Sequence, residues 1–559
     1  MDMYLVLDEN NEIFEPFIQA YKEEFEAGYI ECTKEFYTAE GAQFFKSHSV
    51  MEYLALVERR MAEECSRVDR YFHPSTYQPL RAACQDVLIL KHMDLLKAEF
   101  ARLVSEGKHE DMSQILRILD PVQYSEICLI LENTVEAEGR DILEKNKDMV
   151  LNDIELYFSL IVKVRDKFNS LLEKALNNET QAFKAIERAH KKIINSNCVT
   201  LTHKTADINA EFLAQYSDSL LNQKGMSEED FEEAIDKVGT ILSYIESKDI
   251  FLAHYLNLTT ERLILNNTRG HDLEEKLLTK IKERSDDEMT FKLERMLADY
   301  KVSKKHKENF EQFLQQKDPT FKVKMEVTLL TDGIWPHQEE RKCSMPFEIE
   351  WGVSLFQEFY FSTHSGSRKL TWMYSVSKAE IETNFYRKPY IFQSSTFQMI
   401  VLFQFNDAIS FSIQQLQERT QIQKNLLLQV LTTLLKTKVL SCEGELNQSA
   451  VVGINSEFRH KKTRVDINIA LASSGEQDEP KTTKKEVVLN REVVMEAAMV
   501  RVMKSRKQLS HEDLLEEVTL SLRSRFKVDI ELFKKCVEHL IEMDYLERGD
   551  HNGIYKYVV

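Results

Sequence analysis

Glycine and proline are scarce in this chain, and long apolar runs are absent. The 559 residues include only 15 Gly and 9 Pro. Such a composition argues against a loop-rich all-β protein, a collagen or a disordered chain, and it favours long helices. No stretch approaches the roughly 18 consecutive apolar residues of a membrane span. We therefore expect a mainly helical, soluble protein that does not use a membrane as a partner.

Local catalytic and metal-binding motifs are also missing. The sequence has no G-x-x-x-x-G-K-[ST] loop, no G-x-G-x-x-G after a strand, no H-E-x-x-H and no G-x-S-x-G. The eight cysteines are scattered without a C-x-x-C pair, and no histidines or cysteines cluster at metal-ligand spacing. The first residues show no basic region followed by an apolar run, so we expect no secretory signal. We predict an intracellular protein with reduced thiols, no cofactor, no metal and no catalytic residues.

The net charge of the chain limits the classes of macromolecule that it is expected to bind. Lys and Arg number 73 against 92 Asp and Glu, which gives a net charge of −19. A chain this acidic is not expected to bind nucleic acid along its length, although a local basic patch is compatible with the balance.

Hydrophobic periodicity divides the chain into a helical part and a mixed part. From about residue 17 to 314, apolar residues recur at three- and four-residue steps, most clearly over residues 151–176. Similar stripes predict helices over residues 51–70, 79–103 and 232–255. From Phe321 to Leu329 the period changes to strict alternation, which predicts a half-buried strand.

The remaining pattern predicts a mixed region, a linker and a compact end. Residues 396–405 and 464–469 are predicted as strands, and residues 413–419 and 421–437 as amphipathic helices. Residues 472–485 read as a flexible linker. After it, helices near 491–506, 511–522 and 531–543 and strands near 545–548 and 555–558 predict a winged-helix domain. Ser510, with Asp513 three residues on, is the expected cap of its second helix.

Nine short segments together resemble a known family. They are residues 67–76 (RVDRYFHPST), 212–221 (FLAQYSDSLL), 244–251 (YIESKDIF), 333–336 (GIWP), 368–372 (RKLTW), 395–399 (STFQM), 499–504 (MVRVMK), 544–548 (DYLER) and 555–557 (YKY). In this order they resemble the cullins, the scaffold subunits of multisubunit ubiquitin ligases. The resemblance is greatest to the cullin of SCF ligases, which use F-box proteins.

The resemblance implies a mainly α fold of helical cullin repeats followed by a cullin-homology domain with a helical bundle, an α/β portion and winged helices. The expected domains are an N-terminal stub (1–16), a second-repeat-like cullin repeat (17–115), a third-repeat-like cullin repeat (116–207), a helical bundle (208–320), an α/β and first winged-helix portion (321–471), a linker (472–486) and a C-terminal winged helix (487–559).

In the cullins a RING-box protein adds a strand to the α/β sheet, so that an unpaired sheet edge gains main-chain hydrogen bonds. The two predicted strands 396–405 and 464–469 are the expected hosts, although they could equally be ordinary core strands. The residues predicted to offer this backbone edge are Thr396, Phe397, Met399, Val401, Arg464, Val465 and Ile467.

The resemblance also assigns a modified lysine. Cullins accept a ubiquitin-like modifier on the lysine that closes the MVRVMK-type motif, which is Lys504 here. Helical geometry places Met495, Met499 and Val502 on one stripe and Lys504 on the opposite side, where it should be exposed. From spacing alone, an ordinary solvated lysine is the simpler interpretation. By resemblance, a ubiquitin-conjugating enzyme, an exchange factor and a deneddylase are further partners.

Two departures from the family pattern change what we expect. The match begins close to Tyr21, with what resembles the second repeat, so we expect no binding to the substrate adaptor. The basic residues that attract the acidic tail of a conjugating enzyme are depleted, because Asn222, Gln223 and Glu261 occupy much of that space. Lys224 and Arg262 are the expected remnant of that groove, and recruitment should be slower and less salt-sensitive.

Three readings follow from the sequence. The first is a non-catalytic scaffold of a cullin-RING ligase in the cytoplasm and nucleus. The second is a truncated competitor that sequesters RING-box protein without an adaptor. The third is nucleic-acid binding through the winged helix, using the basic stripes at residues 501–507 and 460–464; the acidic net charge and the lack of interleaved aromatics weigh against it.

Overall fold

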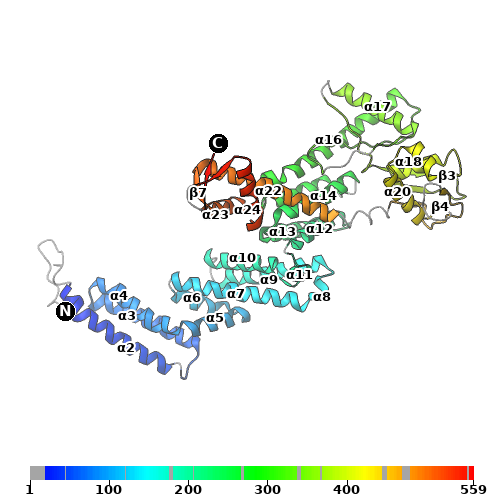
Figure 1. Ribbon diagram of the computed structural model, residues 1–559. Helices are drawn as coiled ribbons and strands as arrows, with labels where there is room; N and C mark the ends of the chain where they lie inside the picture. Colours follow the sequence, from blue (N-terminus) through cyan, green and yellow to red (C-terminus); the bar gives the residue numbers. More distant parts are fainter. Residues whose placement is uncertain are drawn as a thin grey trace. The chain divides into compact units, whose positions relative to one another are not determined.

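The chain forms two compact units, residues 1–206 and 207–559 (Figure 1). The computed structural model describes residues 19–558, apart from 45, 120, 176–179, 206, 224, 266–267, 269, 337–341, 365–367, 443–449, 469–478 and 550–552. Among these residues, no helix is both long and apolar enough to cross a bilayer.

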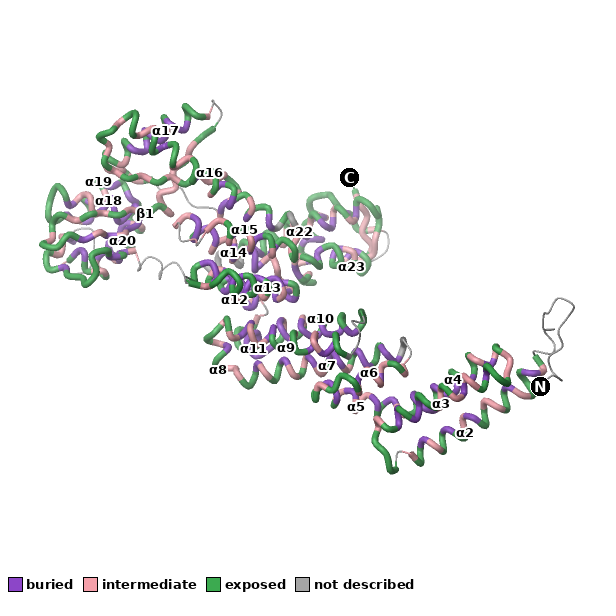
Figure 2. Tube along the Cα trace, turned by 180° about the vertical axis from the view of Figure 1, so that it is seen from behind, coloured by how far each residue is buried: buried purple, intermediate pink, exposed green. Residues whose placement is uncertain are grey.

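All the secondary structure of the first unit is helical over its described residues. Its elements are η1 (Tyr21–Glu26, a π-helix), α2 (Ala27–Phe44), α3 (Val50–Tyr71), η2 (Pro74–Thr76), α4 (Tyr77–Leu88), η3 (Leu90–His92), α5 (Met93–Glu106), α6 (His109–Ile118), α7 (Pro121–Lys145), α8 (Lys147–Val150), α9 (Ile154–Ala175), α10 (Thr180–Asn195) and α11 (Cys198–His203). Buried residues lie along the inner sides of the packed helices α7, α9 and α10 (Figure 2). The stripe predicted over residues 151–176 is confirmed as α9, in which Tyr157 and Phe168 are fully buried.

The single helix predicted over residues 79–103 is wrong, because the structure breaks it into α4 and α5. The phenol of Tyr53 donates a hydrogen bond to the Leu88 carbonyl at 3.0 Å. That carbonyl would otherwise accept from His92, whose N–H instead bonds to Ile89 O at 3.0 Å in a tighter turn. A tertiary contact therefore ends α4.

The second unit begins with a helical bundle and continues through mixed structure. Its helices are α12 (Ile208–Asn222), α13 (Glu228–Tyr244), α14 (Lys248–Ile264), α15 (His271–Lys282), α16 (Asp287–Lys317), α17 (Phe347–Thr363), α18 (Thr396–Gln404), α19 (Ile413–Thr420), α20 (Lys424–Lys436), α22 (Glu479–Arg506), α23 (His511–Leu522) and α24 (Ile530–Glu542). The helix predicted over residues 232–255 is again two helices. The N–H of Lys248, the first residue of α14, bonds to the carbonyl of Arg525 near the other end of the unit, which separates α14 from α13.

The described residues of the second unit also form three small sheets. Their strands are β1 (Lys378–Glu382), β2 (Ile391–Ser395), β3 (Ser410–Ser412), β4 (Leu440–Cys442), β5 (Val451–Ile454), β6 (Arg464–Asp466), β7 (Gln508–Ser510), β8 (Leu546–Arg548) and β9 (Ile554–Tyr557). The strand orders are β1-β2-β6, β3-β5-β4 and β7-β9-β8. In the first sheet β1 is antiparallel to β2, and β6 is parallel to it. The short strand predicted at residues 464–469 is thus confirmed over Arg464–Asp466.

The C-terminal block has the three helices and the β-wing that the sequence predicted. α22, α23 and α24 enclose a core that contains Met495, Met499 and Phe533. The cap at Ser510 is confirmed, because its hydroxyl accepts from the Asp513 N–H at 3.1 Å. The predicted linker is wrong at its C-terminal end, since residues 479–485 belong to α22; residues 472–478 lie outside the described residues.

Candidate functional site

A groove of about 2740 Å³ opens in the second unit between α16, two extended segments and the sheet β1-β2-β6. The first extended segment runs over residues 321–331, and the second runs over residues 369–373. Neither segment is paired into a sheet within the described chain.

The first extended segment has the side-chain pattern of a strand. From Phe321 to Leu329, half-buried residues alternate with exposed ones. Phe321, Val327 and Leu329 pack against a core of aromatic residues from α16 and α17. The strand predicted here is therefore confirmed in its alternation of side chains. It is not paired in a sheet, because none of the backbone groups of residues 322–328 bonds to any described part of the chain.

The end of this segment is fixed to α16. Ser303 Oγ accepts a hydrogen bond from Leu329 N–H at 2.8 Å and lies 3.2 Å from Leu329 O. Asp299 accepts from Thr331 N–H at 2.8 Å and from the indole N–H of Trp335 at 2.9 Å. These contacts place the segment along α16 with its register set.

The second extended segment faces the same core. Trp372 packs on Phe356 with 5.8 Å between ring centroids, and Leu370 joins the same cluster. The backbone of residues 369–372 also makes no hydrogen bond within the described chain. The buried indole N–H of Trp372 has no acceptor among the described residues. Unpaired polar groups of this kind mark a place where a further group is missing.

One of the two predicted host strands is a helix. A capping box between Ser395 and Gln398 starts α18 directly after β2. Thr396, Phe397, Met399 and Val401 are consequently buried in α18. Their backbone groups are oriented along a helix axis, so they cannot pair with an incoming strand, and this site prediction is corrected.

The other predicted host strand does lie at the rim of the groove. β6 is the last strand in the order β1-β2-β6, and Arg464 lines the groove. Its guanidinium reaches across β2 to both carboxylate oxygens of Glu380 on β1, at 2.7 and 2.8 Å. Val465 and Ile467 are buried in the core. The backbone of Ile467 is already paired, because its N–H donates to Gln393 O at 2.9 Å and its carbonyl accepts from the Gln398 side chain at 3.1 Å, so Ile467 is corrected as a host residue.

Lys504 is exposed near the end of α22, as the helical pattern predicted. Met495, Met499 and Met503 on the other side of the helix are fully buried. A hollow of about 480 Å³ lies next to Lys504 and is lined in part by Val493, Val500, Leu540 and Tyr545. In the described chain Lys504 forms no ion pair, which leaves its amine accessible. Its neighbour Arg506 is paired with Glu517 at 3.0 Å, so the basic stripe is partly neutralised.

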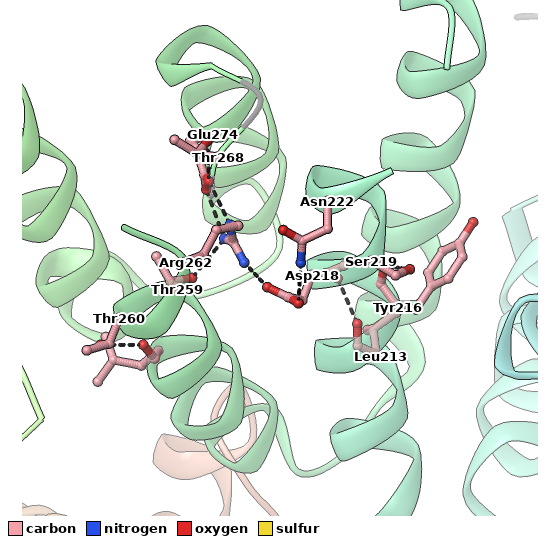
Figure 3. A network of polar contacts seen from close by, with 12 residues as sticks. Leu213, Tyr216, Asp218, Ser219, Asn222, Thr259, Thr260, Arg262, Thr268 and Glu274 are labelled. Atoms are coloured by element: carbon pink, nitrogen blue, oxygen red, sulfur yellow. Dashed lines mark hydrogen bonds and ion pairs between the residues drawn. The ribbon is translucent and has the colours of Figure 1, made fainter. Parts of the chain in front are cut away.

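Arg262 is buried, and this corrects its predicted role in a surface groove (Figure 3). Its guanidinium donates to both carboxylate oxygens of Glu274, at 2.7 and 2.9 Å, and also to Asp218 and to Thr259. Burial alone would lower the pKa of Arg262, but the hydrogen bonds to Glu274 raise it above its usual value. With 3% of its surface exposed, Arg262 cannot attract a distant acidic tail. Lys224 lies outside the described residues.

A cluster of possible metal ligands was missed by the sequence reading. His271, Asp272 and Glu275 hold ligand atoms within 4.8 Å of one another. Asp272 and Glu275 are exposed, and His271 contacts Glu275 at 3.4 Å as an ordinary pair one turn apart. Both ring nitrogens of His271 are buried without a hydrogen-bond partner among the described residues.

Three family models match parts of the chain. Residues 1–307 match the cullin alpha solenoid domain, residues 329–458 the cullin alpha+beta domain and residues 490–552 the cullin protein neddylation domain. The first match extends to residue 1, upstream of the start near Tyr21 that we expected.

Full-length relatives agree with the domain matches. The chain is 32% identical to Cullin-1 of Dictyostelium discoideum over 562 residues, which cover 97% of this chain and 72% of that protein. It is 30% identical to Cullin-1 of Caenorhabditis elegans, over 97% of this chain and 71% of that protein. Cullin-1 of Schizosaccharomyces pombe is 31% identical, over 98% and 73% respectively.

Proposed function

Since the chain belongs to the cullin family, we propose that it is the non-catalytic scaffold of a cullin-RING ubiquitin ligase and acts in ubiquitin-dependent protein degradation. A scaffold contributes proximity: it raises the effective concentration of a charged conjugating enzyme near a substrate without side chains that react. The RING-box protein and the ubiquitin-conjugating enzyme supply the chemistry.

The open groove is the observation that carries this proposal. Two extended segments and β6 border it, and the backbone of residues 322–328 and 369–372 is unpaired within the described chain. A strand from a RING-box protein would satisfy these groups by β-augmentation. The corrected host is thus the segment from Phe321 to Leu329 with β6, in place of residues 396–405.

Lys504 is the proposed acceptor of the ubiquitin-like modifier. It lies within the matched neddylation domain, is exposed, and has an unpaired amine in the described chain. An exchange factor and a deneddylase complete the proposed set of partners, and the cytoplasm and nucleus are the proposed location.

A co-purification experiment tests the proposal. The full chain is co-expressed with a RING-box protein, and a Lys324→Pro variant serves as the matched comparison. Proline removes one backbone N–H that has no partner in the described chain, so the fold should persist while strand addition weakens. Capture of the RING-box protein by the wild type and reduced capture by the variant support the scaffold; no capture by the wild type overturns it.

The same preparation separates the scaffold from the competitor. A substrate adaptor of the F-box class is added, and its recovery is measured. Recovery together with the RING-box protein supports a complete scaffold, whereas recovery of the RING-box protein alone supports sequestration.

A further inference from the structure

The unpaired stretch of the first extended segment is held at both ends. At its start, Asp318 Oδ1 accepts from the Thr320 N–H at 3.1 Å and from its hydroxyl at 2.6 Å. At its end, Ser303 and Asp299 hold Leu329 and Thr331. Residues 322–328 lie between these two fixed points.

The C-terminal end of the stretch is held by two side chains on one turn of α16. Ser303 and Asp299 are four residues apart, so they lie on the same face of the helix. Both are buried, with 5% and 8% of their surface exposed. Asp299 accepts three hydrogen bonds beyond the helix, from Thr331 N–H, from the Thr331 hydroxyl and from the Trp335 indole, at 2.8 to 2.9 Å.

These hydrogen bonds fix a segment whose own backbone N–H and C=O groups are unpaired within the described chain. In most proteins, a buried carboxylate or hydroxyl forms hydrogen bonds with other groups of the same fold. Here they bond the residues at the end of an extended stretch whose backbone forms no hydrogen bond within the described chain. Within the stretch, the Glu326 side chain pairs with Lys307 of α16 at 2.6 Å. Gly352 on α17 lets the helix approach this stretch closely, because a Cβ there would lie 2.8 Å from the Phe321 ring. The stretch is therefore held extended from two sides, by α16 and α17.

We infer that Asp299 and Ser303 are positioning residues, which preset the segment from Phe321 to Leu329 as a docking strand for an incoming polypeptide strand. This inference rests on the proposed function. A segment that is already extended loses less conformational entropy when a strand adds to it, so affinity rises without a new contact to the partner.

The test measures affinity between the full chain and a purified RING-box protein. Ser303→Ala removes both contacts to Leu329, and Asp299→Asn removes the charge that accepts three hydrogen bonds. Each should weaken binding about tenfold, which corresponds to 1.4 kcal/mol. Ser303→Thr keeps the hydroxyl and should bind like the wild type. Ser354→Ala on α17 is the matched control, because within the described chain its hydroxyl bonds only to the Glu350 carbonyl of its own helix.

A second measurement excludes a merely structural role. Amide hydrogen exchange over residues 322–328 is compared with and without the RING-box protein. We expect fast exchange in the free chain, strong protection on binding in the wild type, and weaker protection in Ser303→Ala at equal partner concentration. The thermal midpoint of Ser303→Ala should stay close to that of Ser354→Ala.

The outcomes are distinguishable. If the wild type does not bind the RING-box protein, the proposed function fails. If the wild type binds and Ser303→Ala binds equally well, the proposed function stands and this inference is overturned. The inference is likewise overturned if Ser303→Thr loses as much affinity as Ser303→Ala, because the hydroxyl would then not be the determinant.

Discussion

The guanidinium of Arg491 on α22 forms a two-pronged ion pair with the carboxylate of Asp249 on α14, at 2.5 and 2.8 Å. The two side chains are 18% and 9% exposed, so most of the pair is shielded from water. It joins the C-terminal winged helix to the helical bundle within the second unit. Arg525 adds a neighbouring contact to Asp286 at 3.1 Å.

Removing one member of this pair should detach the winged helix. Asp249→Ala leaves the Arg491 charge largely buried and unpaired, at a cost of about 3 kcal/mol. We expect faster amide exchange in α14 and α22, measured by mass spectrometry. Glu538→Ala is the control, since its pair with Arg548 is exposed and is worth less than about 1 kcal/mol. Equal exchange in the two variants would contradict the prediction.

Lys504 should be the residue that takes the modifier. Lys504→Arg keeps the positive charge and removes the primary amine that can form an isopeptide bond, so conjugation should be lost. Lys507→Arg, three residues away and also exposed, should be modified like the wild type. Peptide mapping by mass spectrometry after an in vitro conjugation reaction identifies the site; a modifier found on Lys507 in the wild type would refute the assignment.

Arg262 should matter for stability and not for recruitment. Arg262→Ala leaves Glu274 and Asp218 without their cation and should destabilise the bundle by about 3–5 kcal/mol, as measured by chemical unfolding. Arg262→Lys, which cannot make the same forked contacts, should be intermediate. The salt dependence of conjugating-enzyme binding should be the same in Arg262→Lys and the wild type. A clear change in that dependence would restore Arg262 to the surface groove.

The first unit should lose stability in mild acid through His190. This side chain is fully buried on α10, and burial lowers its pKa below the usual value. The unfolded chain then binds more protons than the folded one, so stability falls as the pH drops below about 6.5. His190→Phe should flatten the fall in thermal midpoint between pH 7.5 and 5.5. Parallel curves for the two proteins would show that other groups dominate.

Sequence reasoning succeeded where a local pattern decides the structure. The stripe of α9, the exposure of Lys504 and the cap at Ser510 depend on residues within one or two helical turns. It failed over Thr396–Gln404, where an apolar run with β-branched residues reads as a strand. The signal was present in Ser395 and Gln398, which form the capping box that starts a helix.

Other errors came from contacts between distant residues. Arg262 appears as a surface cation in the sequence, and only the packing of α12, α14 and α15 brings Asp218 and Glu274 to it. The breaks before α5 and α14 depend on Tyr53 and Arg525, each more than 30 residues away. The alternation at Phe321 correctly indicated an extended segment, but no pattern in it could show that its pairing partner is not provided by the described chain.

The backbone of residues 322–328 is unpaired within the described chain, so this protein would be prone to aggregate when it is made in excess. An extended stretch with unpaired amides and carbonyls is a template that a second copy can also add to. Two lysines on its outer face, Lys322 and Lys324, are the kind of charge that discourages such self-association. Producing the chain and its groove-binding partner in equal amounts would therefore protect the chain from aggregation. Chains made in excess of that partner would be prone to aggregate and to be degraded.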